Sequence, residues 1–143
     1  MTEDPMAYAK AMLDTHPDPP GGGSGVDPAA IARCAEACAE CAQLSTMCAD
    51  ACLGEPTALE MRSCIRSDLD CADVCAATAR VVARQTAFDT AVVRTLVAAC
   101  AEICGASAEE CERHAAHHAH CRICGEATRR CQQACEQLML ALA

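Results

Sequence analysis

The chain has 143 residues, a formal net charge of −9 and 15 cysteines, with no tryptophan and a single phenylalanine and tyrosine. This length suits one domain with a modest core, and the scarcity of aromatic residues excludes a core built on large rings. Eleven basic against twenty acidic residues leave no basic surface for phosphates, so we expect no nucleic-acid binding. Fifteen is an odd number, so disulfides cannot pair every cysteine within the chain.

The first predicted element is a short helix over residues 4–15, which ends before His16 and Pro17. A stretch rich in proline and glycine follows over residues 17–25, and its composition predicts a linker without regular secondary structure. We therefore expect an N-terminal piece over residues 1–26 and a helical domain over residues 28–143.

Four long helices are predicted in this domain, at about residues 28–53, 56–85, 90–114 and 118–140. Asp27 is placed to cap the first helix with Pro28 as its first residue, and Gly54 lies where a C-cap glycine belongs. Asp89 or Thr90 can cap the start of the third helix. Because the connections are short, the predicted fold is all-α, an antiparallel up-down four-helix bundle with a short additional N-terminal helix.

The cysteines of each predicted helix share one face, because a step of about 100° per residue places them within roughly 80° of one another. This is the face that a bundle buries, so the sequence predicts an interior lined with sulfur. One or two cysteines could serve as small hydrophobic residues, but fifteen on a single stripe indicate another purpose. Disulfides between positions i and i+4 of a helix would require distorted geometry. The cysteines are Cys34, Cys38, Cys41, Cys48, Cys52, Cys64, Cys71, Cys75, Cys100, Cys104, Cys111, Cys121, Cys124, Cys131 and Cys135.

The start of the chain is acidic and has no apolar run, and no stretch approaches the roughly 18 uninterrupted apolar residues of a membrane span. We therefore expect a cytoplasmic protein with no export signal and no membrane association. In the reducing cytoplasm thiols stay free, and dense cysteine then indicates metal binding before it indicates a disulfide scaffold.

The identity of the metal follows from how many thiols each ion needs. Zinc takes four ligands in a closed tetrahedral set, and iron–sulfur clusters use a few cysteines at loop spacings. Cu(I) is soft and accepts two or three thiolates, each of which can bridge two ions. The cysteine-lined interior could therefore hold on the order of 15 Cu(I) per chain. Such a capacity predicts a store and not an enzyme, whose metal needs an open coordination position. A zinc or mixed-metal thiolate buffer and a redox-active thiol protein remain the alternatives.

One end of the predicted bundle is rich in further ligands. It carries the connection between the first two helices and the connection between the last two, with His114 and His118 on the cysteine stripe and His120 just before Cys121. We expect Cu(I) to enter there. At the opposite end Val82, Val93, Leu96 and Met139 are predicted to form an apolar plug.

Asp68 occupies a predicted core position between Cys64 and Cys71. An unpaired carboxylate is costly there. A metal ion or a histidine would relieve that cost, as would an ion pair with an arginine such as Arg122 or a slight rotation of the helix that exposes Asp68.

The chain resembles the bacterial copper storage proteins over about residues 28–142. The resemblance rests on a cysteine-lined four-helix bundle with repeated Cys-x-x-x-Cys pairs, namely Cys34/Cys38, Cys48/Cys52, Cys71/Cys75, Cys100/Cys104 and Cys131/Cys135. The histidine cluster and the lack of a signal peptide resemble the cytosolic branch. The resemblance implies reversible storage of multiple Cu(I) ions, assembly into a homotetramer, and Asp68, His114, His118 and His120 as ligands beside the cysteines. We also expect a copper chaperone as an exchange partner.

Overall fold

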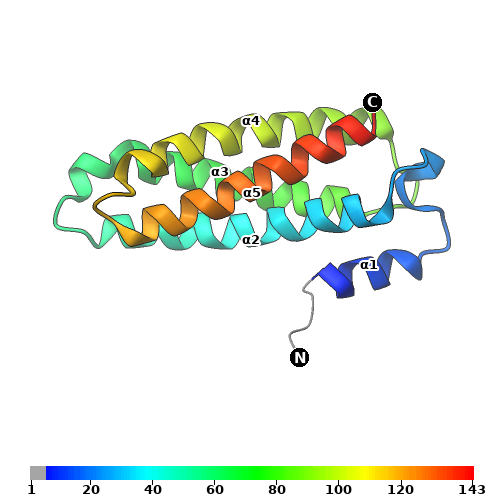
Figure 1. The fold of residues 1–143 in the computed structure, drawn as a ribbon, viewed down its shortest axis with the longest axis horizontal. Coiled ribbons are helices and arrows are strands. Elements are labelled where there is room, and N and C mark those ends of the chain that lie inside the picture. The colour runs from blue at the N-terminus through cyan, green and yellow to red at the C-terminus, as the bar shows by residue number, and fades with distance from the viewer. Residues whose placement is uncertain (1–5) are drawn as a thin grey trace.

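The computed structural model describes residues 6–143, which form an antiparallel bundle of four long helices (Figure 1). A short helix, α1 (Met6–Asp14), lies beside the bundle, and the part of the chain described contains no strand. The predicted all-α bundle is confirmed, while residues 4 and 5 of the predicted first helix lie outside the described residues. The long helices are α2 (Pro28–Leu53), α3 (Arg62–Ala83), α4 (Thr90–His114) and α5 (Ala119–Ala141).

Side-chain caps fix two of the helix starts. The carboxylate of Asp27 accepts a hydrogen bond from the Ala29 amide at 2.9 Å, and that of Asp89 accepts one from the Val92 amide at 3.1 Å. The second long helix starts later than predicted, because a 3-10 segment, η2 (Ala58–Met61), precedes it. Gly54 is the C-cap of α2, but its φ of −81° is open to any residue.

The glycine-rich segment packs against one end of the bundle. It contains a 3-10 segment, η1 (Pro20–Gly23), where no regular structure was predicted. The Gly21 amide donates a hydrogen bond of 2.8 Å to Oε1 of the buried Gln85, whose Nε2 donates to the Val82 carbonyl at 2.8 Å. Gly22 has a φ of +65°, and a Cβ there would lie 2.8 Å from the Phe88 carbonyl oxygen. Glycine is therefore required where the segment crosses the bundle.

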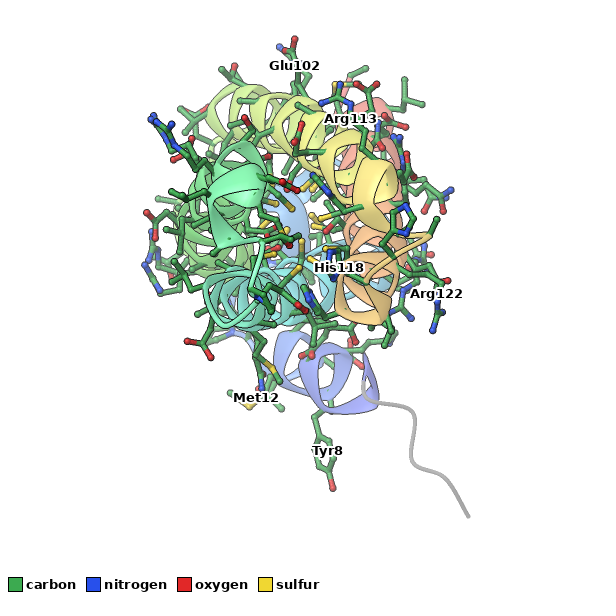
Figure 2. All side chains as sticks on the ribbon, turned by 90° about the vertical axis from the view of Figure 1, so that its left-hand side faces the viewer. Tyr8, Met12, Glu102, Arg113, His118 and Arg122 are labelled. Carbon is green, nitrogen blue, oxygen red and sulfur yellow. The ribbon has the colours of Figure 1, made fainter. Side chains whose placement is uncertain are left out.

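Helix α1 continues the same packing along α2. Leu13 is buried in one hydrophobic cluster with Ile31 and Ala32 of α2, and Ala9 packs against that cluster. Tyr8 points away from the bundle (Figure 2), and Met12 is largely exposed at the edge of the contact between α1 and the bundle.

The apolar plug closes the end of the bundle beneath the glycine-rich segment. Val82 and Val93 are buried there as predicted, but Val97 and Leu138 are the buried residues where Leu96 and Met139 were expected. Val97 and Leu138 each lie three residues from a cysteine of the core stripe. They continue the alternating three- and four-residue spacing of a bundle core, which Leu96 and Met139 break.

Helix α4 has the length and apolar composition of a helix that could cross a membrane, the only such helix in the described chain. Its Cys100, Cys104 and Cys111 are fully buried between the other helices of the bundle. The apolar composition of α4 is therefore what a core helix of a bundle requires.

Candidate metal-binding core

The buried positions of the long helices follow one strict pattern, with spacings that alternate between three and four residues. In α2 this pattern runs through Ile31, Cys34, Cys38, Cys41, Ser45, Cys48 and Cys52, all buried. The same alternation runs through α3, α4 and α5. Because adjacent helices are antiparallel, these positions stack in layers of four side chains, one from each helix.

Nine cysteines form what we call the inner cluster, next to the apolar plug. Two of its layers consist of cysteine alone, and the sulfur atoms in contact are 3.5 to 3.9 Å apart. Every one of these cysteines is free and fully buried. The inner cluster comprises Cys34, Cys38, Cys41, Cys71, Cys75, Cys100, Cys104, Cys131 and Cys135.

Six cysteines form what we call the outer cluster, toward the end with the histidines, and Met61 is buried among them. All six are free and at most 2% exposed. The outer cluster comprises Cys48, Cys52, Cys64, Cys111, Cys121 and Cys124. All four long helices thus contribute buried cysteines to the predicted sulfur-lined interior. The end-on view shows yellow sulfur atoms between the ribbons (Figure 2).

Burial favours the protonated thiols of Cys52 and Cys121 in the metal-free protein. Burial, followed by the neighbouring Cys64, raises the pKa of Cys121 to about 11, and burial likewise raises the pKa of Cys52. A thiol binds metal as thiolate and releases its proton. Each Cu(I) that enters would therefore replace about one proton, and the interior would not accumulate charge.

Asp68 is fully buried in α3, and its side-chain hydrogen-bond contacts are with thiols. The Cys111 thiol donates to its carboxyl at 3.4 Å, with the Cys124 and Cys64 sulfurs at 3.8 and 3.9 Å. Burial, then the nearby Cys124 and Cys64, raises the pKa of Asp68 to about 8, so its carboxyl is neutral at pH 7.

In the metal-free protein Asp68 is thus buried as a neutral carboxyl, which avoids an unpaired buried charge but lowers stability at neutral pH. Arg122, the arginine considered as an ion-pair partner, pairs with Glu126 at 3.3 Å. No rotation of α3 exposes Asp68.

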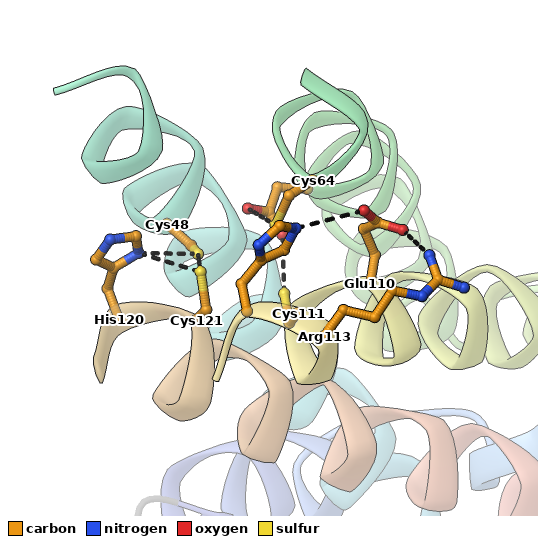
Figure 3. A network of polar contacts seen from close by, with 9 residues as sticks. Cys48, Cys64, Glu110, Cys111, Arg113, His120 and Cys121 are labelled. Atoms are coloured by element: carbon orange, nitrogen blue, oxygen red, sulfur yellow. Dashed lines mark hydrogen bonds and ion pairs between the residues drawn. The ribbon is translucent and has the colours of Figure 1, made fainter. Parts of the chain in front are cut away.

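His120 spans the boundary between the outer cluster and the solvent. Its Nδ1 lies 3.5 Å from the sulfurs of both Cys48 and Cys121, as Figure 3 shows, while its Nε2 lies 3.1 Å from Oε1 of Glu55. Nδ1 of His118 lies 3.3 Å from the same oxygen. The hydrogen bond from His120 holds the pKa of Glu55 below its ordinary value.

An ionised carboxylate only accepts hydrogen bonds, so Glu55 assigns a proton to Nε2 of His120 and to Nδ1 of His118. In the neutral rings, the lone pair of His120 is then on Nδ1 and faces the thiols. The lone pair of His118 is on Nε2. Glu55 was not among the predicted site residues.

The remaining histidines occupy different places. His114 is the last residue of α4, with Nε2 3.7 Å from Glu110, whose other carboxylate oxygen pairs with Arg113 (Figure 3). The sequence analysis placed His118 on the cysteine stripe together with His114, but helix α4 ends at His114. His118 is the N-cap residue of α5 and lies near the centre of this end (Figure 2). His117 is exposed.

The sequence analysis followed the cysteines and did not identify two buried hydroxyls, those of Ser45 and Ser107. Both occupy the three-four spacing between two cysteines, so that spacing could have identified them. The signal for Glu55 is weaker, because it lies in a loop 65 residues away from His120.

The fold and the thiol layers together define a class of protein: a cysteine-lined helical bundle with an interior suited to several soft metal ions.

Comparison with known proteins gives the family. The sequence profile of the copper storage protein family matches residues 27–140, and the chain belongs to this family. The predicted resemblance is confirmed.

Two solved structures and one sequence relative illustrate the relationship. The copper storage protein Ccsp from Streptomyces lividans, loaded with 10 copper equivalents, is 51% identical, with a TM-score of 0.89 over 93% of this chain and 98% of that one. A second structure of a cytosolic copper storage protein from the same organism, with five coppers, is 55% identical, with a TM-score of 0.77 over 78% of this chain and 92% of that one. The cysteine-rich protein YhjQ of Bacillus subtilis is 37% identical over 105 residues, which cover 73% of this chain and 92% of YhjQ.

Proposed function

We propose that this protein stores multiple Cu(I) ions as thiolate clusters inside the bundle. The observation that carries the proposal is the column of fifteen free, buried thiols arranged in layers. A thiolate can bridge two Cu(I) ions, so neighbouring layers can share their ligands along the column. The relative from Streptomyces loaded with 10 copper equivalents supports this proposal.

The sharing of thiols favours Cu(I) over zinc. Cys38, Cys100, Cys131 and Cys135 form one set that could hold a metal, and Cys41, Cys71, Cys75 and Cys104 form another. A third set, Cys75, Cys100, Cys104 and Cys131, takes every member from the first two. Closed tetrahedral zinc sites would compete for these sulfurs, whereas bridged Cu(I) clusters use each of them twice.

A titration tests the storage role. Cu(I) is added anaerobically to the reduced protein in the presence of a chromophoric Cu(I) chelator, which reports the copper that the protein does not take. We expect the protein to saturate at about one Cu(I) per cysteine, roughly 15 per chain. Saturation at three or four ions would contradict storage, and displacement of Cu(I) by an equal amount of zinc would favour a zinc buffer.

We propose that Cu(I) enters at the end with the histidines and that His114, His118, His120 and Asp68 act as ligands there. Nδ1 of His120 faces two thiols of the outer cluster, while the apolar plug closes the other end. Replacing His114, His118 and His120 by leucine should slow loading while capacity stays close to that of the wild type. His117→Leu, at an exposed histidine, is the matched control. Unchanged loading kinetics in the triple variant would refute this route.

The cellular setting is part of the same proposal. A relative from Streptomyces lividans is described as cytosolic, and we propose a cytoplasmic, non-enzymatic role with a copper chaperone as exchange partner. We also propose a homotetramer, which would cover some of the large apolar side chains exposed on one chain, such as Met12, Leu59 and Leu140. Sedimentation equilibrium of the copper-free protein tests the assembly, and a monomer at micromolar concentration would contradict it.

A further inference from the structure

Nitrogen and oxygen ligands gather at the solvent boundary of the histidine end. His114 lies 3.7 Å from a carboxylate oxygen of Glu110, while His118 and His120 lie 3.3 and 3.1 Å from the same oxygen of Glu55. The side chains of these five residues, which we call the rim, are between 14% and 28% exposed. A metal ion from the solvent therefore meets nitrogen and oxygen before it meets sulfur.

Thiols lie directly beneath the rim, and His120 contacts both kinds of ligand. Its Nε2 faces Glu55, while its Nδ1 lies 3.5 Å from the sulfurs of Cys48 and Cys121 (Figure 3). These two sulfurs belong to α2 and α5 and are 4.0 Å apart. With Cys52 they join His120 in a set whose ligand atoms all lie within 4.8 Å of one another. A single imidazole ring thus separates the carboxylate of Glu55 from a pair of thiols.

The two environments suit different oxidation states of copper. Soft thiolates select Cu(I), whereas Cu(II) accepts imidazole nitrogen and carboxylate oxygen in a tetragonal arrangement. For Cu(I), Glu55 can orient the rings of His118 and His120, but its oxygen is a poor ligand for so soft an ion. For Cu(II), the same oxygen and the two rings are all ligands of the preferred kind.

We propose that the rim captures Cu(II) and that Cys48 and Cys121 reduce it to Cu(I), which then enters the store. This inference rests on the proposed entry of copper at the histidine end. Cys48 and Cys121 are the electron-donating pair because they lie on two facing helices. Cys48 and Cys52 lie four residues apart on one helix, where a disulfide would be distorted.

The reduction balances with two copper ions for each pair of thiols. Each Cu(II) gains one electron, and Cys48 and Cys121 together lose two electrons and their two thiol protons, which pass to the solvent. One sulfur–sulfur bond forms as side-chain rotation brings the sulfurs from 4.0 Å to about 2 Å. The two Cu(I) ions bind among the remaining thiols. Two molecules of a low-molecular-weight cytoplasmic thiol then reopen the disulfide by exchange and are themselves oxidised to a disulfide.

Electron paramagnetic resonance tests the reduction, because Cu(II) gives a signal and Cu(I) does not. The fully reduced, copper-free protein is freed of reductant and mixed anaerobically with two equivalents of Cu(II) sulfate. We expect the signal to disappear while one disulfide forms for every two copper ions. After acid quenching and alkylation, peptide masses should place this disulfide between Cys48 and Cys121. A lasting Cu(II) signal, or disulfides scattered over many cysteines, overturns the proposal.

Single variants identify the pair of thiols. Cys48→Ser and Cys121→Ser should each slow the loss of the Cu(II) signal about tenfold or more, since the remaining sulfur has lost its partner. Cu(I) capacity should fall by only about one ion, which reports an intact bundle. Cys34→Ser is the matched control, because it removes an equally buried thiol from the inner cluster. Equal slowing in all three variants would mean that the position of the thiol is irrelevant, and would overturn the proposal.

The double variant Cys48→Ser/Cys121→Ser identifies the rim as the place of capture. Cu(II) should now persist long enough to be frozen, and its signal should show splitting by histidine nitrogens. Adding His118→Leu should remove part of this splitting, whereas His117→Leu, at an exposed histidine outside the rim, should leave it unchanged. A spectrum without nitrogen splitting would place Cu(II) elsewhere and refute capture by the rim.

The reduction and the storage role fail in different ways. A protein that binds about 15 Cu(I) but leaves Cu(II) unreduced keeps its storage role and loses the reduction. A protein that reduces Cu(II) through Cys48 and Cys121 but saturates at three or four Cu(I) loses the storage role and keeps the reduction.

Discussion

Replacing Asp68 by asparagine should stabilise the copper-free protein, and the gain should grow with pH. The carboxyl titrates near its ordinary pKa of 3.8 in the unfolded chain but at about 8 in the folded protein. Between these values only the unfolded chain releases the proton, so stability falls by about 1.4 kcal/mol per pH unit as pH rises. The accumulated loss at pH 7 is about 4 kcal/mol, and it levels off above pH 8. Asparagine has similar shape and no proton to lose.

Urea denaturation followed by circular dichroism, under strictly reducing and metal-free conditions, measures this effect. The difference in unfolding free energy between Asp68→Asn and wild type should increase by about 2.5 kcal/mol from pH 5.5 to pH 7.5. Asp70→Asn is the matched control, because Asp70 lies on the same helix in an exposed pair with Arg66. It should shift stability by less than about 1 kcal/mol. Parallel pH curves for Asp68→Asn and wild type would mean that Asp68 is ionised in the folded protein.

Three further substitutions have defined outcomes. Glu55→Gln removes the carboxylate charge that fixes the ring protons of His118 and His120. Copper loading, measured by stopped-flow transfer, should therefore slow while the copper capacity stays unchanged. A wild-type loading rate would contradict this role of Glu55. Gln85→Ala leaves the buried Gly21 amide unpaired and should lower the unfolding free energy by about 1–3 kcal/mol, with no loss if the glycine-rich segment contributes nothing to stability. Leu138→Ala opens a cavity in the apolar plug and should lower the unfolding free energy by about 2–5 kcal/mol in the same urea assay. A smaller loss would mean that the plug collapses around the cavity.

The sequence alone predicted the bundle and its sulfur-lined interior because both depend on periodicity. A cysteine three or four residues from the previous one returns to the same helical face wherever the helix begins. The plug shows how strict the pattern is, since the alternating spacing selects Val97 and Leu138 over their neighbours Leu96 and Met139. The buried position of Asp68 followed from the same rule.

The arrangement of the histidines could not be predicted in this way, because a helical face has no meaning beyond the end of the helix. Helix α4 stops at His114, and His118 therefore lies in a turn whose path depends on tertiary contacts. Glu55 comes from another connection altogether and meets His118 and His120 only after the bundle has closed. Likewise, the fit of Gly21 against Gln85 joins residues 64 positions apart, which the local composition of a glycine-rich stretch does not reveal.

The apolar plug gives the stored copper an order in time. The side chains of Val82, Val97 and Leu138 close one end of the column, and the glycine-rich segment packs over that end. With entry confined to the histidine end, as proposed above, the last ions to arrive would be the first to leave. Copper near the histidine end would then be the first to exchange with other copper-binding molecules of the cell. The copper deposited deepest would serve as a long-term reserve, reached only after the outer cluster has emptied.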